Sequence, residues 1–269
     1  MLGTRIVTAL VLASALLSAL FMLPYQANVL IFAFVTAIAA WEWAVLLSAS
    51  LRIQVMYPLG VLAGCGMLHL ANPLQPIFWL AAALFWILPA PVWLVRGKPA
   101  PAGISGYLMG AFLLLATWTA IGSLLKWGDE RGMGPILLLG CMSMVWIADI
   151  AAYFFGHLFG RHKLAPAISP GKTWEGVAGA VLGVVLTGTL AFQMSAFPLQ
   201  LPLSLFMGSL VLLTAVSIVG DLFESLLKRR AGLKDSSKLL PGHGGVLDRI
   251  DSLISTLPVA ALILSRSLV

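Results

Sequence analysis

The chain has 269 residues, of which 60% are hydrophobic and only 10% are charged. Soluble domains contain roughly 45–50% apolar and about 25% charged residues, so this composition excludes a water-soluble globular protein. The formal net charge is +6 at neutral pH. In so apolar a chain we assign the basic excess to loops that face an anionic lipid surface, and we expect no nucleic-acid binding.

Nine apolar stretches follow one another along the chain, and each approaches the roughly 20 residues that a helix needs to cross the hydrocarbon core. They are expected near residues 6–23, 29–47, 55–70, 77–94, 107–125, 135–155, 176–197, 201–220 and 253–268. Long runs without period-2 alternation favour helices over a barrel. We therefore predict an all-α polytopic membrane protein with about nine transmembrane helices, the first retained rather than removed as a signal peptide.

The distribution of Lys and Arg predicts how the chain is oriented. If the amino terminus is cytoplasmic, 13 of the 16 Lys and Arg residues fall on the cytoplasmic side. The positive-inside rule favours this arrangement, and an odd number of spans then places the carboxyl terminus in the periplasm.

The chain is expected to form a single integral membrane domain over residues 1–269, with amino-terminal helices in 1–134 and catalytic helices in 135–269. Two long cytoplasmic loops are expected at residues 153–175 and 221–252. They hold nine of the 13 cytoplasmic basic residues and six of the ten acidic residues. Such clustering indicates a ligand, although a solvated loop with mutually neutralising charges is the alternative.

Charged residues in the second loop have helical spacing. Asp221, Ser225 and Lys228 are spaced i, i+4, i+7, so they share one face if the preceding helix continues past residue 220. Asp248 and Asp251 are spaced i, i+3 at the start of the next helix, where carboxylates favour the positive end of the helix dipole.

Between these groups, residues 241–245 read Pro-Gly-His-Gly-Gly. Three glycines around His243 let the backbone approach a ligand closely and present N–H groups to it, as phosphate-cradling turns do. The segment is not a Walker loop, because no Gly-Lys-Ser/Thr follows at the required spacing.

The first loop carries a second set of candidate phosphate ligands, Ser169, Lys172 and Thr173. It contains a Gly-Lys-Thr fragment, but the upstream glycine of a nucleotide-binding motif is missing. Asp149 lies within the preceding apolar stretch, where a carboxylate usually faces the protein interior or a polar cavity.

Taken together, the two loops resemble the phosphatidate cytidylyltransferase (CDP-diacylglycerol synthase) family. The second loop matches the family signature at Ser225, Lys228, Arg229, Lys234, Asp235, residues 241–245, Asp248, Arg249 and Asp251. The first loop is similar at Asp149, Tyr153, Gly160, Lys163, Leu164, residues 168–170, Lys172, Thr173, Glu175 and Gly176, as is the pair Trp41 and Glu42.

The resemblance implies a reaction in which CTP and phosphatidic acid give CDP-diacylglycerol and pyrophosphate with the help of Mg²⁺. It implies Asp221 and Asp248 as the main metal ligands, with Asp251 as a helper, and leaves open a monovalent cation such as K⁺. The implied catalytic residues are Asp221, Asp248, Lys228, Arg229, Lys234, Asp235, His243 and Arg249. The implied substrate-binding residues are Lys163, Ser169, Lys172, Thr173, Ser225, Gly244 and Gly245.

Several assignments have two readings at this stage. Ser169, Lys172 and Thr173 could bind either the lipid phosphate or the nucleotide, and Lys163 could instead recruit anionic lipid. Glu42 and Asp149 could be structural or catalytic.

The expected partners are CTP, phosphatidic acid, membrane lipid and a second copy of the chain in a homodimer. The expected location is a bacterial inner membrane. The alternatives are a CTP-dependent lipid kinase and a lipid or ion transporter. A transporter would be expected to carry inverted repeats and broken helices in matching halves.

Overall fold

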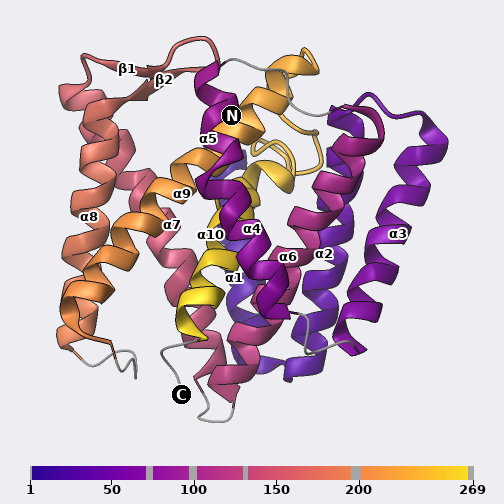
Figure 1. Cartoon of the computed structure of the whole chain (residues 1–269), viewed down its shortest axis with the longest axis horizontal. Helices are drawn as coiled ribbons and strands as arrows, with labels where there is room; N and C mark the ends of the chain where they lie inside the picture. The colour runs from indigo at the N-terminus through magenta and orange to yellow at the C-terminus, as the bar shows by residue number, and fades with distance from the viewer. Residues whose placement is uncertain (1, 71–74, 97–101, 130–132, 195–200, 266–269) are drawn as a thin grey trace.

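The computed structural model describes residues 2–70, 75–96, 102–129, 133–194 and 201–265 (Figure 1). Its helices are α1 (Leu2–Met22), α2 (Tyr25–Leu46), α3 (Leu51–Leu70), α4 (Gln75–Ile87), α5 (Pro89–Arg96), α6 (Gly103–Asp129), α7 (Gly134–Phe159), α8 (Trp174–Gln193), α9 (Leu203–Arg230) and α10 (Leu247–Leu264). Strands β1 (Lys163–Ala165) and β2 (Ser169–Thr173) form an antiparallel hairpin between α7 and α8.

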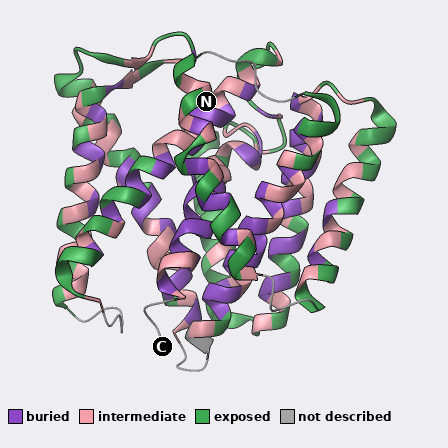
Figure 2. Cartoon of the chain, in the orientation of Figure 1, coloured by how far each residue is buried: buried purple, intermediate pink, exposed green. Residues whose placement is uncertain are grey.

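The centre of the bundle is α10, which packs against α9, α6 and α4. Every residue from 252 to 261 of this helix is buried, and Figure 2 shows the buried positions concentrated along the middle of the molecule. On one side α10 meets the layer of α7, α8 and α9, and on the other it meets α2 and α6, with α3 outside them. The first residues of α10 are thereby fixed by both halves of the chain.

The helical fold class is confirmed, and every expected apolar stretch contains a helix or a helix pair. Eight segments among the described residues are long and apolar enough to span a membrane, with α4 and α5 counted as one segment. The helix α10 is not among the eight, and its 18 residues include Asp248, Arg249 and Asp251. The number of nine spans and the orientation of the termini therefore stay predictions.

Three boundaries differ from the sequence-based expectation. The stretch 77–94 is divided at Leu88, because Pro89 begins α5 and has no backbone N–H to continue α4. The loops expected at 153–175 and 221–252 are shorter, since α7 extends to Phe159, α9 to Arg230 and α10 begins at Leu247. The first of these loops also contains the β1–β2 hairpin, which an all-α prediction did not include.

An aromatic cluster anchors the end of α9 that carries the charged residues. Phe223 is almost fully buried, and its ring centroid lies 5.5 Å from that of Trp86 and 6.1 Å from that of Trp93. These two rings come from α4 and α5, so the break between those helices lets both pack on one side of α9. Edge-to-face and stacked rings of this kind add stability beyond their buried area.

Small residues let α7 and α8 approach closely. A Cβ at Gly179 would collide with the Cβ of Phe155, and one at Gly183 would lie 2.8 Å from the Cβ of Ala151. Close backbone approach through small residues is a common way for transmembrane helices to associate. It places the end of α7 and the start of α8 side by side at the hairpin.

Gly179→Val is expected to lower the free energy of unfolding by about 1–3 kcal/mol, because the Phe155 Cβ is fixed to the α7 backbone and cannot move aside. Thermal unfolding of the detergent-solubilised protein measures the effect. The control is Ala178→Val, at an exposed position on the same helix. Equal unfolding midpoints for the two variants would contradict this account of α7–α8 packing.

Candidate functional site

The hairpin and the segment between α9 and α10 lie at the same end of the bundle (Figure 1). These two segments and the helix ends beside them carry most of the charged residues of the sequence motifs. Two cavities lie there. The hairpin cavity, of about 570 Å³, lies between α7 and α8 and includes Ser169, Lys172, Thr173 and Asp221 in its lining. The loop cavity, of about 670 Å³, includes Lys234, Asp235, His243, Gly244 and Arg249.

The glycine-rich turn of residues 241–245 owes its shape to positive φ angles. Gly242 has φ of 76° and Gly244 has φ of 82°, in a region that other residues rarely adopt. The Leu240 backbone N–H donates to the Gly244 carbonyl at 2.8 Å, which closes the turn. A Cβ at Gly244 would lie only 2.6 Å from Asp248 Oδ2, so this glycine also leaves room for that carboxylate.

The Asp248 carboxylate is held in place by three donors from the preceding segment. Its Oδ2 accepts hydrogen bonds from the Gly245 backbone N–H at 2.7 Å and from the backbone N–H and the hydroxyl of Ser236, each at 2.9 Å. Its Oδ1 accepts a hydrogen bond from Lys228 Nζ at 2.7 Å. Asp248 therefore connects the glycine turn, Ser236 and α9.

These donors keep Asp248 ionised. The residue lies in the first turn of α10, outside the eight candidate spans. Burial by itself would raise the pKa of its carboxyl, but the Lys228 ammonium and the N–H groups of Gly245 and Ser236 outweigh burial and lower the pKa below its ordinary value. The resulting stabilisation is present at neutral pH and is lost as the pH falls through the folded-state pKa.

Glu42 of α2 fixes the same segment from the other side. Its side chain is fully buried, and its Oε1 accepts hydrogen bonds from the Ser237 hydroxyl at 2.6 Å and the Val246 N–H at 3.0 Å. Its Oε2 accepts from the Leu247 N–H at 2.5 Å and from the Ser236 hydroxyl at 3.3 Å. Of the two readings of Glu42, the geometry favours the structural one, because its carboxylate caps the amino terminus of α10.

The continuation of α9 past Gly220 is confirmed, so Asp221, Ser225 and Lys228 do share one face. The Ser225 hydroxyl lies 3.4 Å from Asp221 Oδ1. At the crossing of α9 and α10, a Cβ at Gly220 would lie 2.9 Å from the Asp251 carbonyl. This close crossing brings Asp221 toward the start of α10.

Three ion pairs involve this face of α9, two of them with residues of β2 and α10 and one within α9. Lys172 of β2 pairs with Asp221, and Lys228 pairs with both Glu224 and Asp248. Glu224 is almost fully buried, and the sequence analysis gave it no role. Its i, i+4 spacing from Lys228 was the available signal. Ser236 was missed as well, because a lone serine in a loop has no distinguishing pattern.

Three other predicted site residues have structural contacts or positions that differ from their expected catalytic or substrate-binding roles. Thr173 uses its hydroxyl oxygen to accept the Gly176 N–H at 3.1 Å, which caps the start of α8. Arg229 donates to the carbonyls of Ile168 at 3.3 Å and Leu233 at 3.4 Å, so it joins the hairpin to the loop. Lys163 is exposed on β1 and lines neither cavity.

The three aspartates expected to hold Mg²⁺ lie around the crossing of α9 and α10. Within the described ranges, no three His, Cys, Asp or Glu side chains are close enough to hold one ion. Mg²⁺ usually takes only one or two protein carboxylates and completes its shell with phosphate and water. Both Asp221 and Asp248 already have a partner in the protein on each carboxylate oxygen, so an ion at either would replace one of these contacts. Asp221 is the one of the two that lines the hairpin cavity.

Comparison with known proteins gives the family of the chain. The sequence model of the cytidylyltransferase family matches residues 3–266. This chain belongs to the cytidylyltransferase family. It is 40% identical to the phosphatidate cytidylyltransferase of Pseudomonas aeruginosa over 98% of this chain and 97% of that protein. The protein of the same name from Haemophilus influenzae is 36% identical over 96% of each chain.

A shorter match points to the same family. The phosphatidate cytidylyltransferase of Staphylococcus epidermidis is 38% identical over 162 residues, which cover 60% of this chain. As a member of the cytidylyltransferase family, the chain is an integral membrane nucleotidyltransferase with its charged site at one end of a helical bundle.

Glu42→Ala is expected to destabilise the protein by about 1–3 kcal/mol for each backbone N–H left without an acceptor, those of Val246 and Leu247. Glu42→Gln keeps one acceptor oxygen, so its stability should lie between that of the wild type and that of Glu42→Ala. Thermal unfolding in detergent measures both variants. If Glu42→Ala unfolds at the wild-type temperature, Glu42 does not fix this segment.

Proposed function

We propose that the chain catalyses the transfer of a cytidylyl group from CTP to phosphatidic acid, which gives CDP-diacylglycerol and pyrophosphate. The observation that carries this proposal is the placement of two polar cavities at one end of a membrane bundle. Asp221 lines one of them, and the Lys228–Asp248 ion pair adjoins the glycine turn of the other. The names of the relatives with 40% and 36% identity support the same reaction.

The reaction requires two polyanions to meet so that a lipid phosphate oxygen attacks the α-phosphorus of CTP in line. A new P–O bond forms as the bond to the pyrophosphate oxygen breaks, and the phosphate monoester is already nucleophilic at neutral pH. Positioning and charge neutralisation then supply most of the rate enhancement. The residues of both cavities suit this task better than acid–base catalysis.

Each part of the site has a role in this proposal. Lys234 and Arg249 bind phosphates in the loop cavity, where Asp235 and His243 complete the lining and the glycine turn offers backbone N–H groups. Lys228 balances the buried carboxylates and neutralises phosphate charge beside them. Ser169 and Lys172 line the hairpin cavity together with Asp221. The Ser225 hydroxyl lies beside Asp221.

Mg²⁺ is part of this proposal, with Asp221 as the leading ligand and Asp248 and Asp251 nearby. When bound, the ion would neutralise charge on the transferring phosphate and the leaving pyrophosphate. Asp248 would exchange its contact with Lys228 Nζ to join the ligand set. A monovalent cation such as K⁺ is a further candidate for the same carboxylates.

We also propose an orientation in the membrane, a cellular location and an oligomeric state for the enzyme. Nine spans with a cytoplasmic amino terminus would place both cavities at the cytoplasmic face, where CTP is available. The matching proteins come from bacteria, which supports a bacterial inner membrane. A homodimer is proposed by family resemblance.

The reaction can be tested with the detergent-solubilised protein, CTP labelled in the cytosine ring and phosphatidic acid. Label should enter chloroform-extractable lipid, with release of pyrophosphate, only when phosphatidic acid and Mg²⁺ are both present. Release of CDP with a newly phosphorylated lipid would identify a lipid kinase instead. Folded protein without turnover would favour a transporter.

Asp248→Asn is expected to insert into the membrane and to lose nearly all CTP-dependent activity, because a neutral amide removes the negative charge that balances Lys228 and binds Mg²⁺ more weakly than a carboxylate does. Initial rates at saturating CTP and phosphatidic acid measure the loss, and the unfolding midpoint checks that the variant is folded. A folded variant that keeps more than roughly a tenth of the wild-type rate would remove Asp248 from the reaction centre.

Lys234→Ala is expected to weaken a charge-assisted phosphate contact by about 1.5–3 kcal/mol. The effect should be seen in kcat/KM for CTP. Lys126→Ala is the matched control, since Lys126 is exposed at the end of α6 and belongs to neither cavity. Unchanged kinetics for CTP and for phosphatidic acid would show that the Lys234 charge is only solvated.

A further inference from the structure

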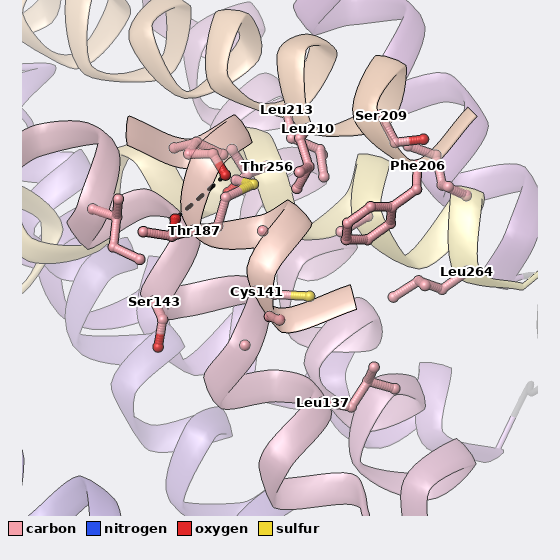
Figure 3. A pocket seen from close by; sticks show the side chains of 18 of the residues that line it. Leu137, Cys141, Ser143, Thr187, Phe206, Ser209, Leu210, Leu213, Thr256 and Leu264 are labelled. Carbon is pink, nitrogen blue, oxygen red and sulfur yellow. Dashed lines mark hydrogen bonds between the residues drawn. The ribbon is translucent and has the colours of Figure 1, made fainter. Parts of the chain in front are cut away.

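An apolar pocket of about 340 Å³ lies among α7, α8, α9 and α10 (Figure 3). Three of the hydroxyl groups in its lining are already used within their own helices. Thr187 donates to the Gly183 carbonyl at 2.7 Å, Ser209 to the Leu205 carbonyl at 2.8 Å and Thr256 to the Ser252 carbonyl at 2.8 Å. With these hydroxyls satisfied, the pocket suits hydrocarbon.

The apolar pocket lies beyond the hairpin cavity along the same three helices, α7, α8 and α9. On α7, Ile147 of the pocket is followed by Ala148 of the cavity, and on α8, Ala180 of the cavity lies one turn before Val184 of the pocket. From Gly176 beside the hairpin to Ala191 at the far end, α8 rises about 22 Å. The hydrocarbon core of a bilayer is about 30 Å thick, so this path extends well into it.

The polar end of this path suits a phosphate attached to a lipid. Ser169 and Lys172 line the hairpin cavity together with apolar side chains such as Leu164, Val177 and Ile218. An amphiphile could therefore place its phosphate beside Lys172 while its chain follows α8.

The loop cavity has a different character. It is lined by four cationic side chains, Arg5, Lys234, Lys238 and Arg249, against the single acidic residue Asp235. Its walls come mainly from the segment between α9 and α10 rather than from membrane-spanning faces. This charge excess suits a water-soluble triphosphate better than a lipid headgroup.

We infer that the hairpin cavity binds the phosphate of the lipid substrate and that the apolar pocket binds one of its acyl chains. The far end of the pocket, where Ala191 faces the starts of α7 and α9 and the end of α10, then limits the length of chain that fits. This inference rests on the proposed function and assigns the nucleotide to the loop cavity.

The test uses a series of phosphatidic acids with saturated chains of increasing length. Ala191→Phe fills the far end of the pocket, so kcat/KM for long-chain substrates should fall at least tenfold while that for the shortest chain stays near the wild-type value. Ala178→Phe places the same ring at an exposed position of α8 that lines neither cavity nor pocket, and its chain-length profile should match the wild type.

Photo-crosslinking gives a readout that does not depend on turnover. Phosphatidic acid with a diazirine near the end of one chain should label peptides of α7, α8 or α9 that line the pocket, and unlabelled phosphatidic acid should compete. Labelling that phosphatidylcholine displaces equally well would indicate bulk membrane lipid and would overturn the inference, as would an equal loss by Ala191→Phe at all chain lengths. A wild-type protein without activity on any phosphatidic acid would instead refute the proposed function.

Discussion

The buried carboxylate of Glu42 is the interaction on which the site depends. A carboxylate removed from water is costly unless hydrogen bonds compensate it, and here four donors do so. Two of these donors are backbone N–H groups at the start of α10, which would otherwise lack partners inside the helix. The same contacts fix Ser236 and the glycine turn, and through them the position of Asp248.

Beside the segment that Glu42 fixes, the charged residues form two groups of ion pairs rather than a loose surface loop. Lys228 lies between the carboxylates of Glu224 and Asp248, while Asp221, two turns before Lys228, pairs with Lys172 of the hairpin. The aromatic packing of Phe223 against α4 and α5 keeps this end of α9 in place. Preorganised charge of this kind does not need to be reoriented when an anionic substrate binds.

Hydropathy alone predicted most of the helices, and helical spacing predicted the shared face of Asp221, Ser225 and Lys228. Both predictions depend on local sequence. The contacts of Glu42 join residues that are 194 to 205 positions apart, and no local pattern encodes them. The sequence of residues 241–245 predicted a close approach of the backbone to another group. It did not reveal that this group would include Asp248 of the same chain.

The remaining differences also have local physical causes. Pro89 was visible in the sequence, but an apolar run with a proline can be either a kinked or a broken helix. The hydroxyl of Thr173 was expected to bind phosphate, while the start of α8 uses it as a cap. Hydroxyl groups serve either purpose, so only the position of the helix boundary distinguishes them.

The reach of Glu42 across the chain has a consequence for biogenesis. Glu42 lies in α2, which is synthesised early. Its carboxylate acquires its full set of partners only after the start of α10, the last helix described, has been synthesised. Until then the segment that orients Asp248 has neither its cap nor its fixed turn. A chain that ends before α10 therefore holds Asp221 and Lys228 but neither the fixed segment nor Asp248, so the charged cluster is assembled only when the last part of the chain has been made.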